Sequence, residues 1–411
     1  MKILFIVGQF PVLSETFILN QITGLIDRGH EVHIYATRKA PGPYHSDVDK
    51  YNLFNRISYC QEIPKGKIKR YLDAVLLACK LIKADPMLLL RAWKALKYRR
   101  RFAFLMVFYD LNSLQTPLAY DIINCHFGHN GIKGMLLKEI GALQGKLITI
   151  FHGGDISYAL QKKGLSIYHS LFERGDLFLP VSERWRKRLI ELGCDETKIQ
   201  VHRMGIDCRR FSFKPRLPNP DGLFKIVTVA RMTQKKGLEF GIKAFARLKK
   251  VYDNAEYTIV GDGPLRANLE SLVNKLDIRN GVRMVGSQKQ HQVIEILESS
   301  HIFMLPSVTA ANGDQEGVPV SLMEAMAMGL PIVSTLHSGI PELVEDGLSG
   351  FLAPEKDVDT LFEKLKYLAE NPERWAEMGS YGRKIVETQY DINLLNDKLV
   401  KIFNQHIRLK N

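Results

Sequence analysis

The chain has few cysteines and no long apolar run. Its 411 residues include five cysteines, an odd number without a Cys-x-x-Cys pair, which is typical of reduced thiols in a cytoplasm. The apolar run at residues 3–7 is too short for the core of a signal peptide. Nowhere do about 18 apolar residues follow one another, so no segment is expected to span a bilayer. We therefore expect a cytoplasmic protein.

Two classes of nucleotide-binding protein lack their motifs here. No Gly-x-Gly-x-x-Gly sequence follows the first expected strand of either half, which argues against a dinucleotide oxidoreductase. The sequence also has no Cys/His finger spacing and no RNA-recognition motif. Although the net charge is +13, we therefore expect no nucleic-acid partner.

Positive charge is concentrated in the first half of the chain. Residues 1–220 hold 34 Lys and Arg against 19 Asp and Glu, a net charge of +15, whereas the remaining residues have a net charge of −2. Residues 65–101 contain twelve of the basic residues. Within them a stripe of apolar residues recurs at helical spacing: Ile68, Tyr71, Leu72, Val75, Leu76, Cys79 and Ile82. The pattern predicts a basic amphipathic helix, which Asp85-Pro86 ends before a second helix begins.

Two interpretations of this basic helix are open. A basic amphipathic segment is typical of an element that docks on an anionic membrane surface, which would place the protein at the inner face of the membrane. Alternatively, the apolar stripe packs on the core of its own domain and the charges form a solvated face.

Length and composition predict two domains. Two α/β units of roughly 200 residues match the usual domain size. The segment KPRLPNPDG, residues 214–222, has three prolines and a glycine and predicts a linker. In the first half, strands are expected at residues 2–7, 31–36, 121–125, 146–151 and 176–181, with helices between them. We expect a doubly wound sheet in each half and domains at 1–215 and 216–390.

The second half repeats a strand, a loop and a helix, with polar residues in each loop. The first loop carries Arg231 and Lys236 after the strand that begins at residue 225. The second carries Gly261 and Gly263 after YTIV, residues 257–260. In a doubly wound sheet these loops meet at the carboxyl ends of the strands, where ligands bind.

Two carboxylates bracket the most informative segment, EGVPVSLMEAMAMGLP at residues 316–331. Gly317, Val318 and Pro319 predict the first turn of a helix, which puts Glu316 just outside the helix and Glu324 inside it. The free N–H groups of that turn would face a phosphate or diphosphate. Each carboxylate can accept hydrogen bonds from hydroxyls, so the layout suits a nucleotide-sugar.

In order and spacing these motifs resemble the donor half of the family 4 glycosyltransferases. They are Arg231 with Lys236 and Gly237, the run from Gly261 to Pro264, the pair Glu316 and Glu324, and the run from Gly339 to Glu342. The first half adds FPVLSETFI (10–18), CHFG (125–128) and FHGGD (151–155), which with PSVTAANGDQEGVP (306–319) resemble the branch that builds bacterial exopolysaccharides such as colanic acid. The resemblance covers nearly the whole chain. It implies the GT-B fold, in which two Rossmann-like domains face each other across a cleft, with residues 391–411 a helix that returns to the first domain.

Roles for the candidate residues follow from this chemistry and from the resemblance. Transfer puts negative charge on the departing diphosphate, which we expect Arg231 and Lys236 to stabilise. Glu324 is expected to bind the ribose hydroxyls and Glu316 those of the transferred sugar. Nucleotide-sugar contacts are also expected at Gly8, Gly261, Gly263, Gly317 and Val318. The resemblance places His152 beside the donor sugar, and Glu15, His126 and Asp155 are candidates on the acceptor side.

The expected reaction moves a hexosyl group from a nucleotide-sugar to a lipid-linked oligosaccharide or another saccharide. UDP is the expected nucleotide, with GDP as the alternative, and the resemblance implies retention of anomeric configuration. Asp-x-Asp, a metal-binding pattern of other transferases, occurs at 47–49 in a polar loop and at 357–359 at an expected helix N-cap. We expect neither to hold a metal, and no cofactor. A phosphorylase or an epimerase on the same architecture stays open as an alternative.

Overall fold

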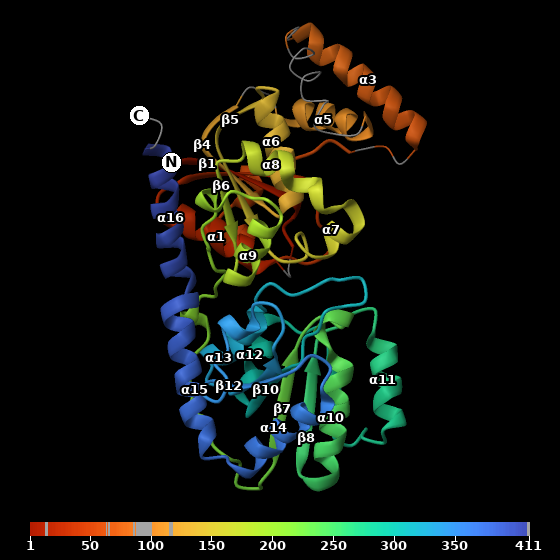
Figure 1. Cartoon of the computed structure of the whole chain (residues 1–411), viewed down its shortest axis with the longest axis vertical. Helices are drawn as coiled ribbons and strands as arrows, with labels where there is room; N and C mark the ends of the chain where they lie inside the picture. Colours follow the sequence, from red (N-terminus) through yellow and green to blue (C-terminus); the bar gives the residue numbers. More distant parts are fainter. Residues whose placement is uncertain are drawn as a thin grey trace.

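The chain forms two lobes, each built on a parallel six-stranded sheet. The computed structural model in Figure 1 describes residues 1–12, 15–62, 64, 66–84, 87, 101–114 and 118–408. The strand orders are β3-β2-β1-β4-β5-β6 and β12-β11-β10-β7-β8-β9, and every pairing is parallel. Both sheets are therefore doubly wound, as the sequence predicts.

The strands of the first sheet extend beyond the expected bounds by up to three residues at an end, apart from β6. Its strands are β1 (Lys2–Phe10), β2 (Glu31–Lys39), β3 (Ile57–Tyr59), β4 (Leu118–His126), β5 (Leu143–Phe151) and β6 (Leu177–Pro180). The helices around it are α1 (Thr16–Asp27), α2 (Asp47–Lys50), α3 (Lys67–Ala84), α5 (Arg101–Leu114), α6 (Gly128–Glu139), α7 (Tyr158–Lys163), α8 (His169–Arg174) and α9 (Glu183–Glu191). Because β1 continues to Phe10, Gly8 lies inside the strand and does not end it.

The second sheet follows the linker at residues 214–222. Its strands are β7 (Phe224–Val229), β8 (Ala255–Val260), β9 (Val282–Gly286), β10 (Ile302–Leu305), β11 (Ile332–Thr335) and β12 (Gly350–Ala353). Its helices are α10 (Leu238–Val251), α11 (Arg266–Lys275), α12 (Gln290–Glu298), α13 (Val320–Ala327), α14 (Val358–Glu370) and α15 (Arg374–Ile385), with short turns η6 (Gln234–Lys236) and η7 (Ile340–Glu342). The inner strands are apolar runs buried on both faces, which is why a parallel sheet forms here.

The last helix, α16 (Ile392–Arg408), returns to the first domain. Figure 1 shows it beside the first lobe, above α15 at the second, and Leu399, Ile402 and Phe403 belong to the core of the first. Its residue Asn396 donates from Nδ2 to the carbonyl of Asn20 on α1 at 3.2 Å. The predicted return of the C-terminal helix is confirmed.

Helix α3 stands out from the first lobe in Figure 1, and its apolar stripe faces outward. Ile68 is 79% exposed and Leu76 68%, and Tyr71, Leu72 and Val75 are exposed as well. Other positions, including Ala74, face the domain core. For these described residues the packing interpretation of the stripe is therefore wrong. The expected second helix after Asp85-Pro86 lies outside the described residues, apart from Met87.

The described part of the chain has neither a membrane-spanning helix nor a cluster of metal ligands. None of the described helices has the length and apolar content needed to cross a bilayer. No group of three or more His, Cys, Asp or Glu side chains within these residues is arranged to hold a metal ion. Asp357 is the N-cap of α14 and accepts the N–H of Thr360 at 2.9 Å, so the expected helix cap is confirmed.

Candidate functional site

A cavity of about 960 Å³ lies between the two sheets, at the carboxyl ends of their strands. This size is in the range of ligand pockets. Of the candidates named from the sequence, it is lined by Arg231, Lys236, Glu316, Glu324, His152, Gly261, Gly317, Val318 and Glu15. Gly8, Gly263, His126 and Asp155 are not among the residues that line it. Most of the expected site therefore converges on one place.

Arg231 and Lys236, two of the cations that line the cavity, come from the loop after β7. Arg231 is exposed, and its guanidinium has no partner among the described residues. Lys236 ends the turn η6, and its ammonium lies 2.9 Å from Oε1 of Glu316. Burial alone would raise the pKa of Glu316, but the ammonium groups of Lys236 and Lys235 outweigh burial and hold this pKa below its usual range. Among the described residues, Arg231 is therefore a free cation at the cavity, whereas Lys236 is paired.

The helix after Glu316 begins later than the sequence predicts. Pro319 is its N-cap in an extended conformation, with φ −64° and ψ 122°, and α13 begins at Val320. The fixed φ of proline suits the extended conformation as well as a first turn, so Gly317 and Val318 belong to the preceding coil. Glu316 lies in this coil, and Val320 and Ser321 bring the helix N-terminus to the cavity wall.

A largely buried network holds the backbone at Glu316, and no motif of the sequence indicated it. The N–H of Glu316 donates to Nε2 of His337 at 3.1 Å, and Nδ1 of the same ring contacts Oε1 of Glu355 at 2.5 Å. Ser338 Oγ donates to the carbonyl of Glu316 at 2.6 Å. Glu355 also accepts the N–H of Thr309 at 2.7 Å. Because Glu355 comes from a loop far along the chain, no local sequence pattern could indicate its role.

Glu324 and Glu15 are carboxyls at the cavity wall without a cationic partner among the described residues. Burial raises the pKa of each to about 7. The Glu324 carboxyl has no hydrogen bond or ion pair within the described part of the chain. Glu15 precedes the first turn of α1 and makes no side-chain cap there, so it too is available to a ligand.

The three first-domain candidates in the CHFG and FHGGD motifs have different surroundings. His152 lines the cavity. His126 is fully buried behind His152, and Nδ1 of His126 lies 3.1 Å from Nε2 of His152. Asp155 is also buried, and its carboxylate accepts the N–H groups of His152, Gly153 and Gly128 at 2.9 to 3.0 Å. We therefore correct the expectation that His126 and Asp155 face the acceptor: they hold the loops behind the cavity.

At three of the candidate glycines, nearby backbone atoms leave no room for a side chain. A Cβ at Gly261 would lie 2.1 Å from the carbonyl oxygen of Ala230, and one at Gly263 would lie 2.6 Å from that of Met232. A Cβ at Gly317 would lie 2.4 Å from the carbonyl oxygen of His152, so the two domains touch there through backbone. These glycines set the distance between loops, and Gly8 has no contact of this kind.

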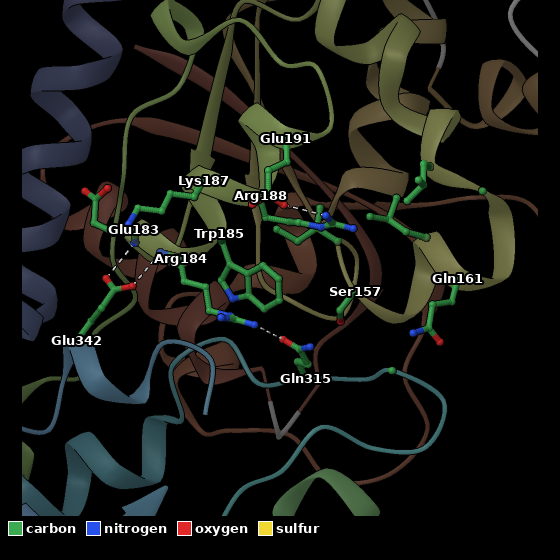
Figure 2. Close-up of a pocket in the computed structure, with 15 residues that line it drawn as sticks. Ser157, Gln161, Glu183, Arg184, Trp185, Lys187, Arg188, Glu191, Gln315 and Glu342 are labelled. Atoms are coloured by element: carbon green, nitrogen blue, oxygen red, sulfur yellow. Dashed lines mark hydrogen bonds and ion pairs between the residues drawn. The ribbon is translucent and has the colours of Figure 1, made fainter. Parts of the chain in front are cut away.

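A second hollow, of about 750 Å³, adjoins the cavity at Gln315, which lines both. Figure 2 shows Arg184 reaching from α9 to Gln315, and its Nη2 donates to Oε1 at 3.2 Å. In the same view the carboxylate of Glu342 meets the start of α9, where it accepts the N–H groups of Glu183 and Arg184 at 2.9 Å each. Glu342 of the expected donor motif therefore ties the second domain to the first.

Comparison with known proteins is consistent with this architecture. Residues 14–210 match the family described as Glycosyltransferase Family 4, and residues 210–385 match the family described as Glycosyl transferases group 1. The amylovoran biosynthesis glycosyltransferase AmsK of Erwinia amylovora is 38% identical over 413 residues, which is 98% of this chain and 100% of the relative. The chain is a family 4 glycosyltransferase. WcaL of Escherichia coli (strain K12), a glycosyltransferase whose name assigns it to colanic acid biosynthesis, is 39% identical to this transferase over 98% of the chain and 99% of the relative.

Solved structures share the transferase's fold across its whole length. Anabaena Alr3699/HepE in complex with UDP has a TM-score of 0.72 at 17% identity, over 98% of this chain and 100% of that one. WaaG, a glycosyltransferase involved in lipopolysaccharide biosynthesis, has a TM-score of 0.65 at 16% identity, over 98% and 99% of the two chains. The transferase therefore has the GT-B fold, as expected from its sequence.

Proposed function

We propose that this transferase moves a hexosyl group from a UDP-sugar to a lipid-linked saccharide during exopolysaccharide assembly. One observation carries the proposal: Arg231, Lys236, Glu316 and Glu324 line a single cavity at the carboxyl ends of both sheets. A diphosphate needs cations and a sugar or ribose needs hydrogen-bond acceptors, and this cavity presents both. The complexes of HepE with UDP and with UDP-glucose and the names of AmsK and WcaL support the donor and the pathway.

The two cations would stabilise the leaving diphosphate. A unit charge at 4 Å contributes about 4 kcal/mol at an effective dielectric constant of about 20, whereas a helix N-terminus contributes about 0.3 to 1 kcal/mol. Arg231 and Lys236 therefore act more strongly than α13. Arg231 is free to bind phosphate at once, while Lys236 would divide its hydrogen bonds between phosphate and Glu316.

The carboxylates would recognise the two sugars. Glu316, held by Lys236 and by the network behind its backbone, accepts hydrogen bonds from the transferred sugar. Glu324 accepts them from the ribose. Glu316 is engaged with a cation, so we assign it to binding and not to nucleophilic attack. Retention then follows from a same-face reaction, in which the departing phosphate oxygen takes the proton of the acceptor hydroxyl.

The first domain would bring the active site to a membrane. The exposed stripe of α3 lies beside Lys69, Arg70 and Lys80, which are at least partly exposed. Each cation near an anionic leaflet contributes about 1 kcal/mol of binding, and the apolar side chains add to it by entering the interface. A lipid-linked acceptor would be reached from this position.

The test is transfer of a labelled sugar. The full chain is incubated with UDP-[¹⁴C]glucose, and in parallel with labelled GDP-mannose, together with bacterial membranes that contain lipid-linked saccharides. We expect UDP release and label in the lipid fraction from a UDP-sugar. An isomerised donor, or sugar phosphate formed with inorganic phosphate, would instead indicate an epimerase or a phosphorylase and contradict the proposal.

A further inference from the structure

A chain of hydrogen bonds runs from the buried side of α1 to His152 at the cavity. Oε1 of Gln21 lies 3.1 Å from Nε2 of His126, and Nδ1 of His126 lies 3.1 Å from Nε2 of His152. We propose that Gln21 and His126 are positioning residues, which determine through this chain which ring nitrogen of His152 carries its proton. The effect on activity rests on the proposed contact of His152 with the donor sugar. The hydrogen bonds between Gln21, His126 and His152 do not depend on that contact.

The geometry of the two rings is that of a hydrogen bond. Their centroids lie 5.2 Å apart and their planes are inclined by 18°. With the nitrogens only 3.1 Å apart, both must point along the line that joins the ring centres. The rings are therefore nearly coplanar and meet edge to edge, so one nitrogen donates and the other accepts.

Apolar surroundings keep both rings neutral. Gln21 and His126 are fully buried, and the rings of Phe17 and Phe127 lie 4.8 Å and 4.4 Å from that of His152. Burial is the main cause that lowers the pKa of His152 to about 3 and the pKa of His126 well below its usual value; nearby His129 and His202 act in the same direction. Near neutral pH each ring therefore carries one proton.

Neutral rings in such a chain have two proton arrangements only. A neutral imidazole has one donor nitrogen and one acceptor nitrogen. If Gln21 accepts from Nε2–H of His126, then Nδ1 of His126 must accept from Nε2–H of His152. If Gln21 donates instead, both rings carry the proton on Nδ1. The two histidines thus share the same tautomer in either case, and the amide of Gln21 selects which.

The oxygen of Gln21 faces His126, which selects protons on Nε2 in both rings. Nδ1 of His152 then carries no proton. Of the four ring nitrogens of His126 and His152, it is the one that these hydrogen bonds leave for a ligand. A bare nitrogen accepts a hydrogen bond from a sugar hydroxyl, whereas the other tautomer would donate one. Gln21 therefore determines whether the cavity presents an acceptor or a donor at His152.

The experiment measures the tautomers directly in the full chain. Protein labelled with ¹⁵N-histidine gives long-range ¹H–¹⁵N spectra, and the signals of His126 and His152 are assigned by replacing each in turn. We expect Nε2–H in both rings of the wild type. Gln21→Met, which keeps the shape but removes the amide, is expected to give two tautomers at both rings. Gln21→Glu, whose ionised carboxylate accepts only, is expected to restore the single Nε2–H form at a pH high enough to ionise this buried carboxyl.

Controls separate this role from a merely structural one. Asn124 of β4 is another fully buried amide, without a hydrogen-bond partner in the described part of the chain, and Asn124→Leu is expected to leave both tautomers unchanged. In Gln21→Met, part of the protein has the proton of His152 on Nδ1. We expect kcat with a UDP-sugar to fall in proportion to this fraction, with little change in KM. Different tautomers on the two rings, Nδ1–H on both, or no effect of Gln21→Met would overturn the proposal. If only the donor assignment is wrong, UDP-sugar leaves the His152 signals unshifted while the tautomer results stand.

Discussion

The ammonium of Lys236 lies 2.9 Å from Oε1 of Glu316, so the cation expected to bind phosphate is already paired with the acid expected to bind sugar. Both side chains are largely buried. Arg231 lines the same cavity without a partner among the described residues. The two cations therefore begin from different states, and their variants are expected to differ in stability as well as in activity.

Arg231→Ala is expected to reduce turnover by about 100- to 1000-fold, because a preorganised donor to the leaving group is lost. Its stability should stay near that of the wild type, since the guanidinium is exposed and has no partner within the described parts of the chain. Steady-state kinetics of labelled transfer measures the effect. Lys243→Ala is the matched control, because this cation on α10 pairs with the exposed Glu239 at 3.7 Å and does not line the cavity. Turnover of Arg231→Ala within a few-fold of wild type would remove the assignment.

Lys236→Ala is expected to lose a similar factor in turnover and also to lower the free energy of unfolding by about 3 kcal/mol, since it leaves a buried carboxylate unpaired. Urea unfolding measures the loss. Glu316 has a lowered pKa in the folded state, so its pairing stabilises the fold fully above the usual Glu value of about 4.5 and is lost as pH falls from there through the lowered pKa. The deficit should therefore shrink in acid.

The double variant Lys236→Ala/Glu316→Gln tests the cause of that deficit. Removing the unpaired charge is expected to recover most of the stability at neutral pH but none of the turnover. A double variant as unstable as Lys236→Ala alone would show that the ion pair is not responsible.

Glu324→Gln is expected to stabilise the protein only at higher pH. The folded state holds the pKa of Glu324 at about 7, above its usual value of 4.5, so the wild type loses stability as pH rises from about 4.5 through 7. The variant does not ionise at this position and so does not lose this stability. The difference in the free energy of unfolding is on the order of 1 kcal/mol, because water at the cavity wall screens the charge. Thermal unfolding should show no difference at pH 4 and a higher Tm for the variant at pH 8. A Tm gain at both pH values would contradict the assignment.

Transfer activity is expected to survive treatment with EDTA, because Arg231 and Lys236 supply the positive charge that a divalent ion provides in other transferases. The measurement compares turnover in EDTA with turnover in added magnesium or manganese. Loss of activity in chelator, with recovery on adding either metal, would show that the diphosphate is bound through a metal.

Replacing Leu72 and Leu76 of α3 with Ser is expected to weaken binding to vesicles that contain anionic lipid. Both side chains are exposed, so the change should affect interfacial binding more than folding. Co-sedimentation with anionic and zwitterionic vesicles measures binding. Leu217→Ser, at another exposed position that is 68% accessible, is the control. Equal binding of the Leu72/Leu76 variant and the wild type would exclude α3 as the docking element.

The sequence predicted the elements and loops better than the contacts between them. Apolar runs ended by polar or glycine-containing loops located the strands, and the carboxyl-end rule of doubly wound sheets placed Arg231, Lys236 and Glu324 correctly near one another. Pro319 shows the limit of local patterns, because proline suits both a first turn and an extended N-cap. Only the surrounding coil decided between these conformations.

Local composition also could not tell which side of α3 would be buried. The stripe from Ile68 to Leu76 has the spacing of a packed helix face, yet it is exposed. Periodicity shows that a helix has an apolar face but not what covers that face. The neighbouring elements decide this, and here they pack on other positions of α3, such as Ala74.

The sequence was enough to determine the two doubly wound sheets and the cavity at their carboxyl ends. It also determined the cationic, acidic and glycine residues of that cavity, because strand periodicity and loop chemistry are local properties. Tertiary structure alone decided that Lys236 pairs with Glu316, that Glu355 and His337 hold the backbone of Glu316, and that Gln21 and His126 stand behind His152. The physical reason is that buried polar groups must find hydrogen-bond partners wherever the fold brings them, and these partners lie far apart along the chain.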